Sequence, residues 1–153
     1  MTKIAVTFLA AVMLSTTAWA AGGEPKPEPT GTPGLSAESR YNAGLALTRR
    51  DDWKGAEKKF REAIALQPEF PEAWNELGHA LKNQERYDES IKAYEQALRL
   101  RPNYVQALEY LGEAYVKMGK LDQARAVLAR LQPLDQHQAD ELDRVISGGS
   151  TGW

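Results

Sequence analysis

The chain has 153 residues, which is enough for one compact domain. Its 19 basic and 21 acidic residues nearly cancel, so a net charge of −2 gives no general attraction to nucleic acid or to an anionic membrane. The sequence contains no cysteine, which excludes disulfides, thiolate metal sites and cysteine nucleophiles. We therefore expect neither nucleic acid nor a membrane surface to be the main partner.

The first 20 residues have the layout of a secretory signal. Lys3 supplies a positive charge, residues 4–14 form an uncharged apolar run, and Ala18 and Ala20 place small residues before a cleavage site. The apolar run is shorter than the roughly 20 residues that cross a bilayer as a helix. We expect residues 1–20 to be a signal peptide cleaved after Ala20, which would give a periplasmic or secreted protein without membrane insertion. Retention of this segment as an anchor is the alternative.

Proline alternates with glycine and charged residues over positions 21–35. Proline lacks an amide donor and disfavours helix in the residue before it, and the segment has few apolar groups to bury. These features predict an extended linker that acts as a spacer. A proline-motif ligand is the alternative role.

From Ser36 onward, a pattern with the period of a helix repeats every 34 residues. Gly44, Gly78 and Gly112 hold this spacing. Further small or large apolar positions do so too, namely Leu47, Leu81 and Tyr115; Ala56, Ser90 and Ala124; Phe60, Tyr94 and Leu128; and Ala63, Ala97 and Leu131. Such a period predicts an array of stacked units, with repeats at 37–70, 71–104 and 105–138.

The sequence pattern of each unit predicts two amphipathic helices. In the middle unit, Trp74, Leu77 and Leu81 share one helical face. Gly78 and Ser90 are small, which lets the two backbones of the hairpin approach closely. Glycine inside a helix costs about 0.5–1 kcal/mol relative to alanine, so three glycines in register imply that close packing offsets this cost.

The expected helix ends follow from capping residues and prolines. Ser36 can cap the first helix, Pro71 suits the first turn of a later one, and Pro68 and Pro102 end second helices. In the third repeat Gln136 stands where the closing proline would be, and Pro133 comes earlier, so we expect its second helix to end near Leu131.

Residues 134–147 predict one more amphipathic helix. Leu134, Gln138, Leu142 and Val145 would share its inner face. An array needs such a helix to cover its last apolar face, so the sequence predicts a capping helix, and docking of a partner is the alternative role. The array would then span residues 36–147, followed by a flexible tail at 148–153.

These residues resemble the tetratricopeptide repeat (TPR) family. The middle unit carries the resemblance through Trp74, Leu77, Gly78, Leu81, Ser90, Tyr94, Ala97 and Pro102. The first unit departs from the pattern at Arg40, where the family prefers a large apolar residue. The resemblance implies an all-α, right-handed α-solenoid of three TPR hairpins plus the C-terminal capping helix. It also implies a small exported bacterial TPR protein that binds a protein or peptide without a cofactor.

In this family, the first helix of each hairpin lines a concave groove. The resemblance therefore implies peptide-binding positions at Tyr41, Asn42, Leu45, Arg49, Asn75, Glu76, His79, Lys82, Asn83, Glu109, Tyr110, Glu113 and Lys117. Asparagine can bond both the amide and the carbonyl of a peptide, and the tyrosines can anchor apolar groups. His79 could make binding sensitive to acid pH. Tyr41 and Leu45 stand where some relatives hold a C-terminal carboxylate with lysine and asparagine, so we expect no receptor of that kind.

The sequence favours a non-enzymatic adaptor in periplasmic complex assembly. The alternative is a scaffold that forms homo-oligomers through the ends of the array. An enzyme is disfavoured because the chain has only two histidines, His79 and His137, and lacks HExxH, Walker-type and GxSxG motifs. A metal or acid–base cluster of His79 with Glu76, Glu109 and Glu113 is less favoured than a mixed polar groove, so we expect no catalytic or metal site.

Overall fold

The fold is described from a computed structural model in which residues 36–149 are placed. All described residues belong to one compact unit. The expected signal peptide and linker, and residues 150–153 of the expected tail, lie outside the described residues.

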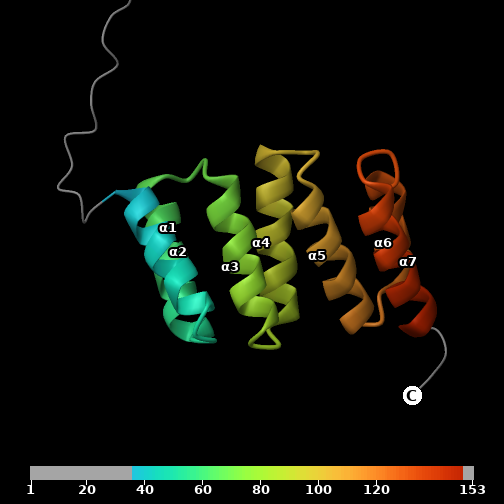
Figure 1. The fold of residues 1–153 in the computed structure, drawn as a ribbon, viewed down its shortest axis with the longest axis horizontal. Helices are drawn as coiled ribbons and strands as arrows, with labels where there is room; N and C mark the ends of the chain where they lie inside the picture. The colour runs from blue at the N-terminus through green and yellow to red at the C-terminus, as the bar shows by residue number, and fades with distance from the viewer. Residues whose placement is uncertain (1–35, 150–153) are drawn as a thin grey trace, which may run out of the picture. The chain divides into compact units, whose positions relative to one another are not determined.

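The described part of the chain consists of seven helices and contains no strand. They are α1 (Ala37–Thr48), α2 (Trp53–Leu66), α3 (Pro71–Lys82), α4 (Tyr87–Leu100), α5 (Val105–Lys117), α6 (Leu121–Leu131) and α7 (Gln136–Gly149). Consecutive helices form the hairpins α1–α2, α3–α4 and α5–α6, which stand side by side with α7 after the last (Figure 1). None of these seven helices has the length and apolarity required to cross a bilayer. The predicted all-α array of three hairpins with a capping helix is confirmed.

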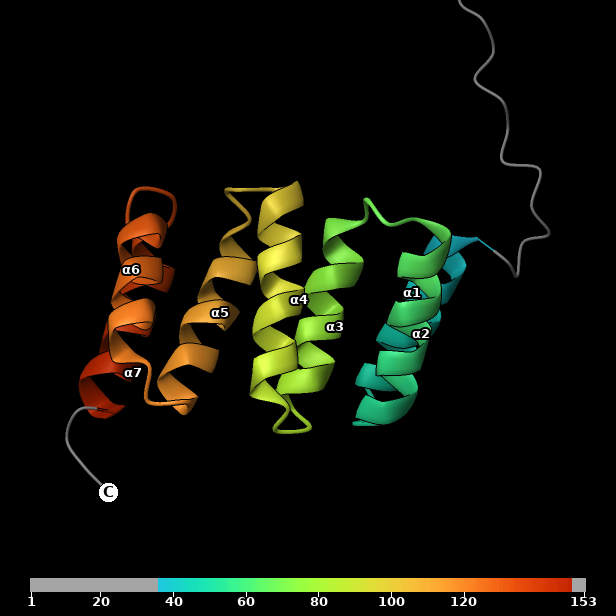
Figure 2. The ribbon, with the colours of Figure 1, turned by 180° about the vertical axis from the view of Figure 1, so that it is seen from behind.

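The helices form an inner and an outer layer. Helix α3 packs on α1 and α5, and α5 packs on α7, whereas within residues 36–149 no Cα atoms of α2 and α4, or of α4 and α6, come within 8 Å of each other. The odd-numbered helices therefore crowd together while the even-numbered ones spread apart. This difference makes the odd-numbered side the concave face of the array. Figure 2 shows the same helices from behind.

Capping groups and turns set the helix ends. Ser36 Oγ accepts a hydrogen bond from Ser39 N at 3.0 Å, which confirms the predicted cap, and Pro71 is the first residue of α3. The turn inside each hairpin needs a left-handed residue, supplied by Asp51, Glu85 and Gly119 with φ of 57°, 60° and 68°. These three positions are 34 residues apart, so the turn repeats with the array.

Close packing at the repeated glycines is confirmed. A Cβ added to Gly78 would lie 2.6 Å from the ring of Tyr94, and one at Gly44 would meet Phe60 in the same way. In the third hairpin the pattern changes, because a Cβ at Gly112 would lie 2.5 Å from Leu142 of α7. The capping helix therefore supplies the large side chain that covers this glycine.

The predicted inner face of the capping helix is correct at Leu142 and wrong at Leu134 and Val145. The buried residues of α7 are Ala139, Leu142 and Ile146, whereas Leu134 and Val145 are exposed. Leu134 lies in the turn before the helix, where its amide donates to the carbonyl of Leu131. The helix begins two residues later than the expected start, and its register brings the 139–142–146 stripe onto α5 and α6.

The core is made of two hydrophobic clusters that meet at Trp74. One lies between the first two hairpins and includes Phe60 and Leu77, and the other runs from α4 to α7 and includes Leu108 and Leu142. Trp74 packs against both clusters, and its Nε1 donates to the carbonyl of Pro68 at 2.9 Å. This tryptophan therefore fixes the second hairpin against both of its neighbours.

Candidate functional site

Residues of α3 and α5 that the sequence predicted for the groove come together on the inner layer. The rings of His79 and Tyr110 stack with centroids 5.2 Å apart. Lys82 Nζ lies 4.5 Å from the centroid of the Tyr110 ring and donates to Glu113 at 2.5 Å. We call His79, Lys82, Tyr110 and Glu113 the groove cluster. The groove cluster connects α3 and α5, the first helices of neighbouring hairpins, and its contacting residues are 31 positions apart in the sequence.

Glu76 and Asn75 lie beside this cluster. Glu76 Oε2 is 3.9 Å from His79 Nδ1, and Asn75 Nδ2 donates to Glu76 Oε1 at 3.3 Å. Asn75 is fully buried, contrary to the expectation of an accessible contact, and its Oδ1 has no hydrogen-bond partner in the described part of the chain. An unpaired buried acceptor is unusual in a folded protein. The Asn75 Oδ1 atom is therefore able to accept one more hydrogen bond.

The predicted residues of α1 lie on the neighbouring inner helix, and Tyr41 is near enough to Glu76 for that charge to act on it. The Tyr41 ring packs against Phe70 with centroids 5.0 Å apart, and Leu45 packs on the core of the first two hairpins. Asn42 and Arg49 are exposed, and Arg49 is the residue at which α1 ends. Helix α1 therefore contributes a half-buried tyrosine and leucine and two solvated polar groups.

The other predicted residues surround the groove cluster on two sides. Asn83 Nδ2 donates to the carbonyl of His79 at 2.9 Å, so its amide partly serves to close α3. Lys117 is exposed and lines a hollow of about 360 Å³ together with Lys82 and Glu113. Glu109 is half-buried, and the side-chain amide of Gln138 on α7 lies 3.0 Å from its Oε1 in the orientation that donates.

Tyr104 is a groove residue that the sequence reasoning missed. It precedes α5, its hydroxyl bonds Gln106 Oε1 at 3.4 Å, and Gln106 Nε2 donates to the Tyr110 hydroxyl at 3.2 Å. The Arg101 guanidinium lies 4.7 Å from the centroid of the Tyr104 ring. The expected contacts lay on first helices alone, whereas Tyr104 stands directly before one, and an aromatic residue at that place is the signal for it.

Burial and nearby carboxylates raise several pKa values on the concave face. Burial, together with the charges of Glu72, Tyr41 and Glu76, raises the pKa of Tyr104 to about 12. Burial first, and the charge of Glu76 with it, also raises the pKa of Tyr41, Tyr94 and Tyr110. Burial and the neighbouring charge of Glu113 raise the pKa of Glu109. Burial is the leading cause of each shift, and neighbouring negative charge adds to it.

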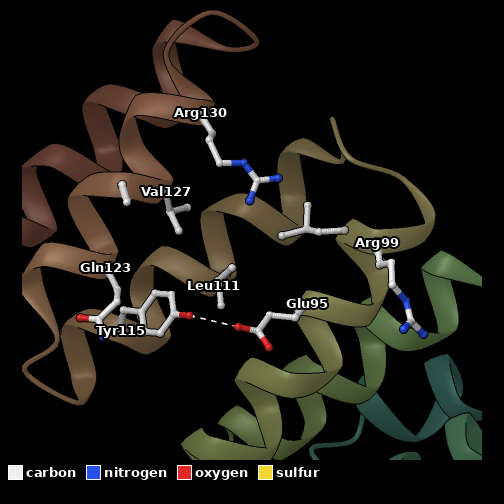
Figure 3. Close-up of a pocket in the computed structure, with 9 residues that line it drawn as sticks. Glu95, Arg99, Leu111, Tyr115, Gln123, Val127 and Arg130 are labelled. Carbon is white, nitrogen blue, oxygen red and sulfur yellow. Dashed lines mark hydrogen bonds between the residues drawn. The ribbon is translucent and has the colours of Figure 1, made fainter.

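A second hollow lies on the outer face, and the sequence reasoning missed it. It has a volume of about 350 Å³, with Leu98, Leu111 and Val127 among its apolar lining residues. Figure 3 shows Arg99 and Arg130 beside it, and the Tyr115 hydroxyl donating to Glu95 at 3.2 Å. The hollow exists because α4 and α6 do not touch, which leaves part of α5 open between them.

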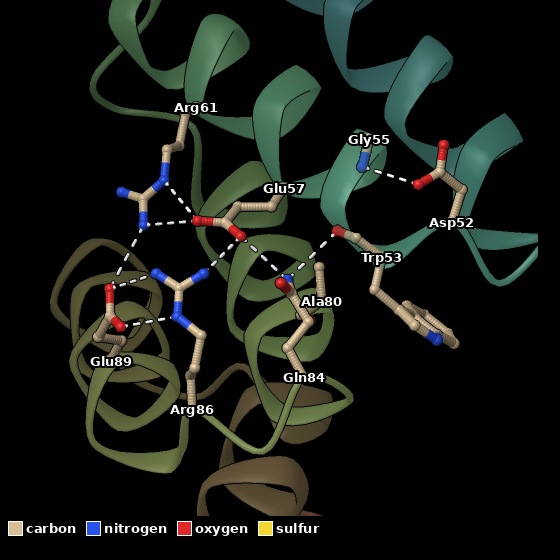
Figure 4. A network of polar contacts seen from close by, with 9 residues as sticks. All are labelled: Asp52, Trp53, Gly55, Glu57, Arg61, Ala80, Gln84, Arg86 and Glu89. Atoms are coloured by element: carbon tan, nitrogen blue, oxygen red, sulfur yellow. Dashed lines mark hydrogen bonds and ion pairs between the residues drawn. The ribbon is translucent and has the colours of Figure 1, made fainter.

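A polar network fixes the first hairpin to the second (Figure 4). Glu57 of α2 accepts hydrogen bonds from Arg86 Nη1 at 2.7 Å and Gln84 Nε2 at 2.9 Å, and Arg61 Nε donates to it at 3.1 Å. Arg86 also holds Glu89 at 2.7 Å. Burial favours the neutral acid, but these hydrogen bonds outweigh it and lower the pKa of Glu57. The network sets the angle between two hairpins that share the groove.

Glu57→Gln is expected to lower the free energy of unfolding by about 1 kcal/mol near pH 7, because it removes one charge from this network. A lowered pKa means that the stabilisation is present above the ordinary value of 4.5 and is lost as the pH falls through the lowered pKa. The stability difference between wild type and variant, from urea unfolding at pH 7 and pH 3, should therefore shrink on acidification. A difference that stays constant or grows at pH 3 would contradict the assignment.

Within residues 36–149, no group of three or more histidine and acidic side chains is arranged to hold a metal ion. His79 has Glu76 as its one carboxylate neighbour within 4 Å in this part of the chain, and its ring is stacked on Tyr110. The geometry of the groove cluster is that of a contact surface built from rings, amides and ion pairs.

Comparison with known proteins places this geometry in a family. Tetratricopeptide repeat models match residues 71–104 and 93–126, and a TPR repeat model matches residues 44–85. The chain is a TPR repeat protein. TPR proteins are non-catalytic binding modules that typically act in protein–protein interaction, and this chain is such a module.

Several solved structures share this fold. The TPR2B-domain:pHsp70-complex of yeast Sti1 is 24% identical over 74% of this chain and 95% of that one, with a TM-score of 0.70. MamA is 27% identical over 69% of this chain and 62% of that one, with a TM-score of 0.64. The first TPR of Spaghetti (RPAP3), bound to the HSP90 peptide SRMEEVD, is 17% identical over 76% and 94%, with a TM-score of 0.70. No protein with a curated description matches the chain.

Proposed function

We propose that the concave face binds a short extended or helical segment of a partner protein and that this binding serves the assembly of a periplasmic complex. The observation that carries the proposal is the groove cluster, in which half-buried rings and polar groups of α3 and α5 meet on one face. Export rests on the layout of residues 1–20 alone. The proposal makes the chain an adaptor rather than an enzyme.

The side chains of this face suit a peptide. Tyr110 and His79 offer flat, partly exposed rings, and rigid aromatic groups are the usual anchors of binding energy at interfaces. Gln106 and Asn83 offer amides that can bond a peptide backbone. A bound segment would therefore contact the rings of His79 and Tyr110 and find hydrogen-bonding side chains beside them.

The size of the array also supports a short segment. The Sti1 and RPAP3 chains named above were solved with pHsp70 and an HSP90 peptide, and this chain covers 95% and 94% of their lengths. An array of this length is thus enough to hold a brief peptide. We do not extend those particular ligands to this chain, because Tyr41 and Leu45 replace the expected lysine and asparagine of a carboxylate clamp.

A paired set of variants tests the proposal. Recovery of partner proteins by the tagged chain from a periplasmic fraction is expected to fall about tenfold or more in His79→Ala/Tyr110→Ala, since each change removes an anchor ring. The matched control is Tyr115→Ala/Gln123→Ala, which removes a ring and an amide from the outer hollow. Equal recovery by wild type and the groove variant, or loss only in the control, would contradict binding on the concave face.

Self-association through the ends of the array is the second candidate. The exposed Leu134 and Val145 near the last helix are the observation in its favour. Sedimentation of the full chain should show a monomer at all concentrations if the groove adaptor is right. Oligomers that disappear in Leu134→Ser/Val145→Ser would favour the scaffold instead.

A further inference from the structure

We infer that the segment bound on the concave face is cationic, with a lysine or arginine side chain received among Glu76, Glu109 and the groove tyrosines. This inference rests on the proposed function and names the chemistry of the partner. Three observations on α3, α5 and the turn before α5 support it. They are carboxylates without an ion pair, a buried acceptor without a hydrogen bond, and tyrosine rings that contact cations.

The first observation is an excess of carboxylates over cations. Glu113 is paired with Lys82, and Glu72 is paired with Arg101. Glu76 and Glu109 have no lysine or arginine within 4 Å in the described part of the chain, and their neighbours are the His79 imidazole and the Gln138 amide. Lys82 acts on Glu109 only from beyond this distance, and Lys117 lies further along α5, so two carboxylates of this face lack a direct ion pair with a lysine or arginine of the described residues.

The second observation is a buried polar atom of α3 that lacks a partner. Asn75 exposes none of its surface, its Nδ2 donates to Glu76, and its Oδ1 accepts no hydrogen bond within residues 36–149. Buried polar groups are normally satisfied, so the unpaired acceptor of Asn75 beside Glu76 is consistent with a missing donor. An amide oxygen next to a carboxylate calls for a donor rather than an acceptor.

The third observation is that the tyrosine faces already hold cations. Lys82 Nζ lies over Tyr110 and the Arg101 guanidinium lies over Tyr104. A cation over an aromatic face is attracted by the ring quadrupole. Burial first, and then the charge of Glu113, raises the pKa of Glu109. The outer hollow differs in its charged lining residues, which are Arg99, Arg130 and Glu95.

A peptide selection with matched variants tests the inference. Random dodecapeptides displayed on phage are selected on the immobilised full chain, and the enriched sequences are synthesised for titration. We expect lysine- or arginine-rich peptides that carry an apolar residue. Their affinity should fall about tenfold or more in Glu76→Gln/Glu109→Gln and should weaken with added salt. Circular dichroism on each variant verifies that the helices are retained.

The control is Asp122→Asn/Asp143→Asn, which makes the same change of net charge at exposed positions of α6 and α7. An equal loss in this control would overturn the inference, because the attraction would then be general. Neutral or acidic peptides that bind the wild type and are lost in Tyr110→Ala would overturn it while leaving groove binding intact. If no selected peptide loses affinity in Tyr110→Ala, the proposed function fails, and the inference fails with it.

Discussion

Leu142→Ala is expected to lower the free energy of unfolding by about 2–5 kcal/mol, the cost of truncating a buried leucine where the surroundings cannot collapse. Leu142 is 1% exposed and its side chain lies directly against the backbone of Gly112. The large side chain that covers the corresponding glycine in the other hairpins is an aromatic ring of the same hairpin, whereas the third hairpin depends on α7. Removing this leucine therefore uncovers the end of the array.

Urea unfolding followed by circular dichroism measures the effect, and Val145→Ala is the matched control on the same helix. Val145 is 40% exposed, so its truncation should change the free energy of unfolding by about 0.5 kcal/mol or less. Equal effects of the two substitutions would show that α7 does not pack through the Ala139–Leu142–Ile146 stripe.

Gly78→Ala is expected to destabilise the fold by about 1–3 kcal/mol although alanine is the better helix former. The added Cβ would lie 2.6 Å from the ring of Tyr94, which is fully buried and has no space to move aside. Overpacking outweighs the gain of about 0.5–1 kcal/mol that alanine brings to a helix interior. The substitution would push α3 and α4 apart and disturb the floor of the groove.

Gly148→Ala is the control for this prediction. A Cβ at Gly148 meets nothing within 4 Å and the residue lies in α7, so this change should be neutral or slightly stabilising. The midpoint of thermal unfolding should therefore fall in Gly78→Ala and stay unchanged or rise slightly in Gly148→Ala. A Gly78→Ala variant as stable as Gly148→Ala would contradict the close approach of the two helices.

The sequence predicted the hairpins because their determinants recur in register. Gly44 and Gly78 each face an aromatic ring 16 positions later, and the same spacing can be read from the printed chain. The predicted face of α7 was wrong at Leu134 because this residue precedes the start of the helix. Asp135 accepts a hydrogen bond from the amide of Gln138 at 3.1 Å and so starts the helix after Leu134. This aspartate is a capping signal that the hydrophobic pattern alone overlooked.

The candidate site was predictable only in part. The positions of His79, Lys82, Tyr110 and Glu113 followed from the resemblance to the family, but their mutual contacts join residues about 31 positions apart and no local pattern contains them. The burial of Asn75 depends on packing between helices, which residue type alone does not give. The outer hollow was missed for a related reason, since it arises from the gap between α4 and α6.

Binding on the concave face can be tested most directly by photo-crosslinking from two tyrosine positions of α5. Tyr110 stacks on His79 in the groove cluster, and Tyr115 borders the outer hollow, so the same helix carries a tyrosine toward each face. Benzoylphenylalanine placed at Tyr110 is expected to capture a partner in cells, whereas the same group at Tyr115 should not. Adducts from Tyr115 with none from Tyr110 would contradict binding in the groove.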